Sequence, residues 1–98
     1  MLKVYDKAQW HIDAGEDEKA VVNKMKILFG FLDAKGLLQQ EGKEMLELGV
    51  DSSISIHERM LTEQGNKFMD AKYDTVINTS EEEFGEALES VFTESLKA

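Results

Sequence analysis

The sequence predicts a mainly α protein, a compact bundle of about four helices with a short extended or β-like N-terminal segment. Two observations predict it. Apolar residues recur at helical spacing from residue 16 onward, and several expected helices carry recognisable start or stop residues. A chain of this length without cysteine has one apolar core, so we expect a single domain over residues 1–98.

The first 14 residues lack a helical period. Leu2, Val4 and Tyr5 predict a short strand, and residues 10–12 predict a second extended piece. Residues 7–8 between them fit a turn or a single turn of helix.

The first long helix is expected from about Glu16 to Gly36. Acidic residues 16–18 suit the positive end of a helix dipole, and Gly36 is a typical left-handed stop. Its apolar residues cover most of the circumference, which is typical of a helix that the others pack around. They include Val21, Met25, Leu28 and Leu32.

A second helix is marked by leucines and a methionine between Leu37 and Leu48 and ends at Gly49. Gly42 inside it disfavours a helix by roughly 1 kcal/mol relative to alanine. The next segment, residues 50–61, is ambiguous, because it fits either a strand with alternating Ile and Ser or a short helix capped by a serine.

Two further helices complete the bundle. Thr62 is a good N-cap for the third, and we prefer a helix there to a hairpin at residues 64–66, because the apolar pairs 68/69 and 76/77 do not alternate. The last helix starts with a capping box, Ser80 and Glu83, and its apolar stripe runs to the end of the chain.

The net charge of −9 argues against nucleic acid or an anionic membrane surface as a partner. Residues 1–49 carry seven lysines against nine acids, whereas residues 50–98 carry four basic residues against eleven acids. The acidity is therefore concentrated on the last helix. Glutamates 81–83 fit a solvated first turn, whereas an acidic face continuing along the helix can attract a basic protein partner. The acidic candidates for contact with such a partner are Glu82, Glu86, Glu89 and Glu94.

Trp10 and His11 are the other candidate partner-binding residues. Tryptophan and tyrosine are enriched at interfaces, but the alternative that we prefer is a lid in which Tyr5 and Trp10 cover the helical core.

Neither histidine belongs to a recognisable catalytic or metal-binding motif. His57 and Glu58 match the start of a zinc-protease motif, but Leu61 stands where the second histidine is needed. We therefore predict no catalytic, cofactor-binding or metal-ligating residues and no enzyme. A small metal-dependent enzyme using His11 or His57 remains an alternative.

Residues 5–11 resemble the opening Y-D-x-A-x-W-H of a group of small bacterial proteins of unknown function, and residues 61–68 resemble their L-T-x-x-G-x-x-F segment. The chain departs from that group after Gly49, where it is shorter. The resemblance implies a bacterial protein of the kind that accompanies toxin or mobile-element loci, with an immunity or antagonist role.

The sequence thus predicts a non-enzymatic interaction module that binds a basic protein. It shows no signal peptide and no transmembrane stretch, so we expect a cytoplasmic protein. The alternative is a structural homo-oligomer, such as a homodimer, whose apolar stripes pair with themselves.

Overall fold

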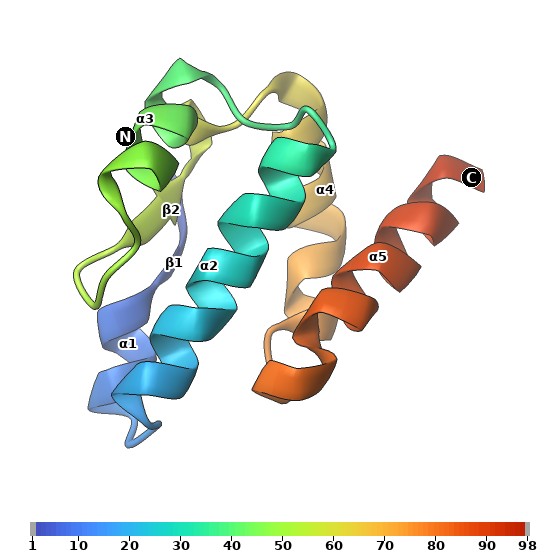
Figure 1. Cartoon of the computed structure of the whole chain (residues 1–98). Coiled ribbons are helices and arrows are strands. Elements are labelled where there is room, and N and C mark those ends of the chain that lie inside the picture. Colours follow the sequence, from blue (N-terminus) through green and yellow to red (C-terminus); the bar gives the residue numbers. More distant parts are fainter. Residues whose placement is uncertain (1, 98) are drawn as a thin grey trace.

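The fold is described by a computed structural model over residues 2–97, and it confirms the expected mainly α bundle with a short β segment (Figure 1). Within these residues the chain forms β1 (Val4–Lys7), α1 (Ala8–Asp13), α2 (Glu18–Ala34), α3 (Gln40–Leu48), β2 (Ser55–His57), the 3₁₀ turn η1 (Glu58–Met60), α4 (Glu63–Val76) and α5 (Glu81–Lys97).

Helix α2 is the element that the others surround, as its sequence predicts. It starts at Glu18 because the Asp17 carboxylate accepts a hydrogen bond from the Ala20 amide (3.1 Å). Its end is followed by Gly36, whose φ of +69° is the left-handed conformation expected of a stop glycine. The buried residues of α2 share one broad face of about half its circumference, while the opposite face is exposed, so the prediction that apolar residues cover most of the helix is too broad. They are Val21, Met25, Leu28, Phe29, Phe31 and Leu32.

Helices α4 and α5 complete the bundle, and α5 packs against both α2 and α4 (Figure 1). The Thr62 hydroxyl accepts a hydrogen bond from the Gly65 amide (3.0 Å), so the predicted N-cap is confirmed and the hairpin alternative is wrong. Helix α5 begins at Glu81, one residue after Ser80, whose backbone carbonyl accepts from the amides of Glu83 and Phe84. Phe84 and Leu88 anchor α5 in the core.

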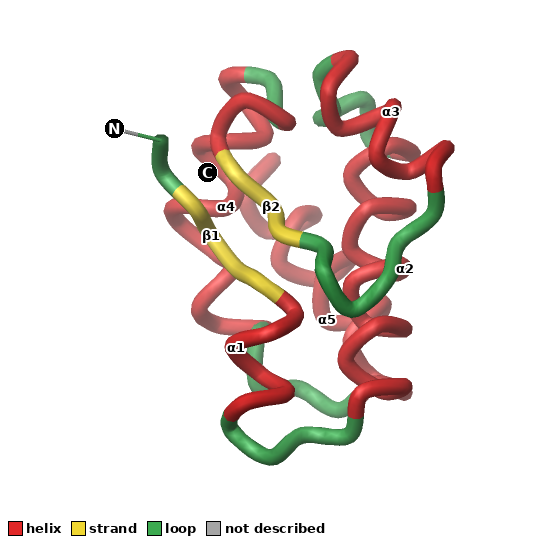
Figure 2. Tube along the Cα trace, turned by 90° about the vertical axis from the view of Figure 1, so that its left-hand side faces the viewer, coloured by secondary structure: helices red, strands yellow, loops and turns green. Residues whose placement is uncertain are grey.

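The sheet resolves the ambiguous segment after Gly49. Strand β2 pairs antiparallel with β1, and the η1 turn follows directly, so residues 55–60 contain both a strand and a short helical turn (Figure 2). Residues 10–12, for which the sequence predicts an extended piece, belong instead to helix α1, so that prediction is wrong. Six residues are too few to show a helical period, and tertiary contacts made by this segment decide its conformation.

Two glycines lie where helices approach other backbone segments closely. A Cβ on Gly42 of α3 would lie 2.6 Å from the Met60 carbonyl oxygen, and a Cβ on Gly65 of α4 would lie 2.7 Å from the Leu37 carbonyl oxygen. Gly42, which counts against a helix on propensity alone, is therefore the residue that allows α3 to pack against η1.

We predict that Gly42→Ala and Gly65→Ala each lower the free energy of unfolding by about 1–3 kcal/mol, because the added methyl group meets backbone that cannot move aside easily. Gly30→Ala is the matched control. Gly30 lies in α2, and no atom lies within 4 Å of the position that an added methyl group would occupy, so this change should stabilise the protein by roughly 0.5–1 kcal/mol. Urea denaturation measures the free energy of unfolding of all three variants. Equal changes at the three positions would contradict the close backbone contacts of Gly42 and Gly65.

Candidate functional site

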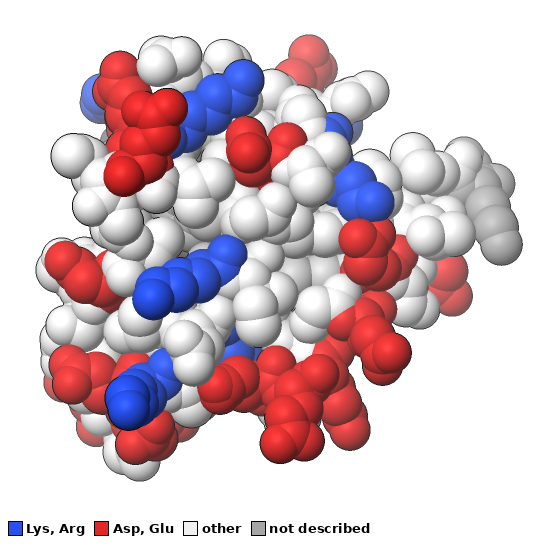
Figure 3. All heavy atoms as spheres, viewed as in Figure 1, with Lys and Arg blue, Asp and Glu red and all other residues white. Residues whose placement is uncertain are grey.

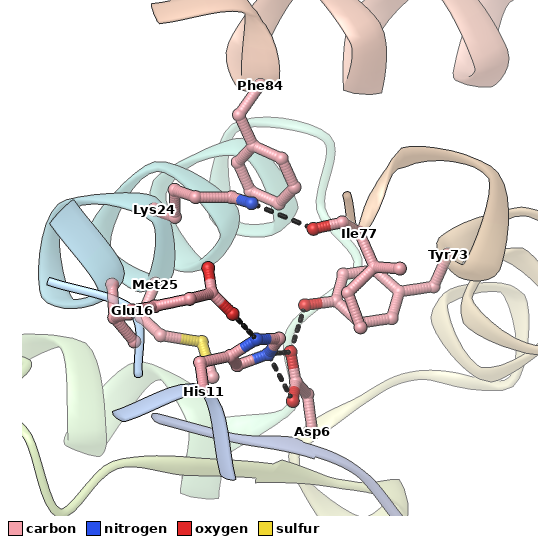
Figure 4. Close-up of a pocket in the computed structure, with 9 residues that line it drawn as sticks. Asp6, His11, Glu16, Lys24, Met25, Tyr73, Ile77 and Phe84 are labelled. Carbon is pink, nitrogen blue, oxygen red and sulfur yellow. Dashed lines mark hydrogen bonds and ion pairs between the residues drawn. The ribbon is translucent and has the colours of Figure 1, made fainter. Parts of the chain in front are cut away.

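The most unusual feature of the interior is the carboxylate of Asp6, which is 2% exposed (Figure 4). Its position on β1 turns the side chain inward, between α1 and α4. The Tyr73 hydroxyl donates to Oδ2 (2.5 Å), and the Lys7 backbone amide donates to Oδ1 (2.9 Å). His11 Nε2 lies 2.8 Å from both carboxylate oxygens. The buried charge is thus compensated by three donors from two different parts of the chain.

His11 lies between two carboxylates. Helix α1 places its ring between β1 and the loop before α2, where Nδ1 lies 2.7 Å from Glu16 Oε2. A carboxylate faces each ring nitrogen, so both contacts are hydrogen bonds together only when both nitrogens carry a proton, which is the charged imidazolium form. Burial lowers the pKa of His11, but the hydrogen bonds to Asp6 and Glu16 outweigh it, and the net effect raises the pKa above its ordinary value. We call Asp6, His11, Glu16 and Tyr73 the Asp6 cluster.

Tyr73 serves the cluster as a neutral donor. Burial, assisted by the neighbouring charge of Asp6, raises the pKa of its phenol far above the ordinary range. The hydroxyl therefore keeps its proton and fixes α4 to β1.

Lys24 lies on the other side of the same region. Its ammonium donates to the carbonyls of Ile77 (2.8 Å) and Thr79 (2.7 Å), just beyond the end of α4, and lies 4.9 Å from the centre of the Phe84 ring. Burial lowers the pKa of Lys24, while Glu16 and Asp6 act in the opposite direction. A cation at this position satisfies carbonyls left without partners by the end of the helix.

These side chains enclose a cavity of about 10 Å³, which is at the lower limit for one water molecule. Its lining combines the Asp6 cluster and Lys24 with apolar side chains from α2, α5 and the residue that follows α4: Val21, Met25, Phe84 and Ile77. The cavity is too small for an organic substrate. Its lining of charged and hydrogen-bonding side chains is better suited to binding a proton than to binding a substrate.

Neither histidine offers an unoccupied ring nitrogen. His57 Nε2 lies 3.0 Å from Glu41, and its Nδ1 accepts from the Arg59 amide (3.3 Å). Among residues 2–97, no three histidine or acidic side chains are grouped so that they could hold a metal ion. The alternative of a metal-dependent enzyme using His11 or His57 stays a prediction.

The predicted partner-binding residues fall into two separate places. Trp10 and His11 lie on α1, while Glu82, Glu86, Glu89 and Glu94 lie on α5; both helices contact α2, and Figure 1 shows them on different sides of it. All four glutamates are exposed.

The lid interpretation holds for Tyr5 alone. Tyr5 is half-buried against the core, and its hydroxyl donates to the Asn66 side chain (2.7 Å). Trp10 is 51% exposed, with the Lys7 ammonium 5.8 Å from its ring centre, so the prediction that Trp10 covers the core is wrong. The His11 ring is directed toward Asp6 and Glu16 (Figure 4), with its side chain 18% exposed.

Sequence reasoning missed Asp6, Glu16, Lys24 and Tyr73 as a group. The available signal was an acidic residue at an inward position of an apolar strand, followed five residues later by a histidine. Tyr73 lies 67 residues from Asp6, and no sequence pattern links the two.

No protein family, curated protein or solved structure matches this chain. The resemblance of residues 5–11 and 61–68 to small bacterial proteins therefore stays a prediction. Within residues 2–97, none of the helices combines the length and the apolar character that crossing a membrane requires.

We predict that Tyr73→Phe lowers the free energy of unfolding by about 1.5–3 kcal/mol, because it removes a hydrogen bond to a buried charged group. Tyr5→Phe is the matched control. It removes a hydroxyl that binds a neutral amide in a half-buried place, and should cost only about 0.5–1.5 kcal/mol. Urea denaturation at neutral pH compares the two; a smaller loss for Tyr73→Phe would show that Asp6 does not depend on this donor.

Proposed function

We propose that this protein is a non-enzymatic interaction module that binds a basic protein partner through the outer face of α5. The observation that carries the proposal is the alignment of exposed glutamates along one helix. Glu82, Glu86 and Glu89 follow each other at spacings of four and three residues, so they share one side, and Glu94 lies on the adjoining side of the helix. Figure 3 shows acidic side chains gathered around this part of the molecule.

Contacts with the core determine which side of α5 faces solvent. Phe84 and Leu88 are almost completely buried, so α5 cannot turn about its axis without exposing them. The backbone positions of the glutamates are therefore fixed relative to the core. Glu89 pairs with Lys35 (2.7 Å), and no ion pair occupies Glu82, Glu86 or Glu94 within the described part of the chain.

An acidic array of this kind favours a basic partner in two ways. It accelerates the encounter by long-range attraction, and it orients the partner before contact. Since the glutamates are exposed, the attraction should weaken with added salt. The resemblance to companions of toxin loci supports an immunity-like role, in which a cytoplasmic bacterial protein neutralises a basic partner.

We predict that the triple variant Glu82→Lys, Glu86→Lys, Glu94→Lys binds such a partner at least about tenfold more weakly. Glu89 is left unchanged because its reversal would also disturb Lys35. The control reverses three exposed acids elsewhere, Asp33, Glu44 and Glu47, and gives the same net charge. Both variants and the unchanged chain are used to capture proteins from a native bacterial lysate at low and high salt, with identification by mass spectrometry.

We expect the control variant to capture a basic protein from the lysate and the α5 variant to fail to capture it. Equal capture by both variants, or equal loss with both, would contradict it, because the effect would then depend on net charge or on another surface.

The alternative function, a homo-oligomeric domain, is favoured by one observation. Leu96, on the last turn of α5, is 71% exposed, although α5 is otherwise anchored by its apolar side. Light scattering over a range of protein concentrations, with Leu96→Ser beside the unchanged chain, distinguishes the two functions. A monomer at every concentration excludes the homo-oligomer, whereas a dimer that Leu96→Ser dissociates favours it.

A further inference from the structure

We propose that the Asp6 cluster is a proton-operated latch, in which the charged His11 ring holds the Glu16 side chain closed over the cavity and loss of one proton from the ring releases it. Three side chains in a row form the latch: the buried Asp6, His11 and the half-exposed Glu16. Glu16 contributes to the cavity lining.

The two carboxylates that hold His11 differ in exposure, and this difference decides which contact opens. Asp6 is 2% exposed and needs the Nε2 proton, since water cannot replace that donor in the interior. Glu16 is 49% exposed, so water can solvate its carboxylate in place of His11. The proton that leaves for solvent is therefore the one on Nδ1.

Loss of that proton changes the contact from attraction to repulsion. The Nδ1 lone pair then faces the Glu16 carboxylate at hydrogen-bonding distance, with no hydrogen between the two acceptors. The Glu16 side chain turns toward water, and the cavity beneath it loses one wall. The Asp6 contacts with Tyr73 and with the Lys7 amide remain.

The other charged and titratable groups around His11 come from each neighbouring element. They are Asp6 on β1, Glu16 before α2, Lys24 on α2, and Tyr73 and Asp74 on α4. Tyr73 keeps its proton because burial raises its pKa. The Lys24 ammonium is held by two backbone carbonyls. His11 is thus the group in this set whose charge changes near neutral pH.

The sign of the pH dependence follows from the raised pKa of His11. The folded protein holds the proton more tightly than the unfolded chain, whose histidine has a pKa of about 6.5. The stabilisation is complete below about pH 6.5 and is lost as the pH rises through the folded pKa. Within that window the unfolding equilibrium constant should rise by up to about tenfold per pH unit.

The test measures the free energy of unfolding by urea at several values from about pH 6 to about pH 9. The unchanged chain should lose stability as the pH rises. His11→Gln should remove that loss. Glu16→Gln should reduce it, because an amide can accept a hydrogen bond from Nδ1–H and can donate one to a bare Nδ1, so the contact persists in both states.

His57→Gln is the matched control, because His57 faces the single carboxylate of Glu41 and lies outside the cluster. It should keep the full pH dependence. Constant stability of the unchanged chain over this range would overturn the latch. An unchanged pH dependence in Glu16→Gln would also overturn it, because the proton would then be coupled to Asp6 alone and Glu16 would not be the part that moves.

Discussion

The buried carboxylate of Asp6 is the constraint on which the arrangement of this protein depends. Removing an ionised carboxylate from water costs several kcal/mol or more unless donors replace the lost hydration. Here the donors come from the adjacent backbone, from His11 on α1 and from Tyr73 on α4. A charge that needs these partners fixes the N-terminal segment against the helices, although that segment contributes only a short strand and six helical residues. It also brings His11 and Glu16 together at the edge of the cavity.

Close backbone contacts fix the opposite end of the molecule. Gly42 and Gly65 allow α3 and α4 to approach the segments around Met60 and Leu37, and the Gln39 amide donates to the Met60 carbonyl (2.8 Å). The Asp6 cluster and the two glycine contacts thus fix both ends of the molecule. The core on which α5 packs does not depend on the exposed residues of that helix. The acidic face can therefore vary in charge without a large effect on folding, as the proposed recognition surface requires. The Asp6 cluster has no such freedom, because each member makes a hydrogen bond that another member needs.

The helices could be predicted because their signals are local. The stop at Gly36, the cap at Thr62 and the apolar periodicity of α2 each depend on residues within a few positions of each other. The conformation of α1 and the roles of Asp6 and Tyr73 could not, because they depend on contacts between residues up to 67 positions apart. Gly42 shows the same limit: local propensity counts against it, while a tertiary contact requires it. The exposed glutamates of α5 were predictable from helical spacing, but the inward position of His11 was not.

Nitrogen NMR of the histidine side chains tests most directly whether His11 is a charged imidazolium held between two carboxylates. At about pH 7 the account predicts ¹⁵N shifts of two protonated ring nitrogens for His11, and a titration midpoint above the value of about 6.5 for an unperturbed histidine. A ring with one protonated and one bare nitrogen at neutral pH, and a midpoint at or below about 6.5, would contradict the account.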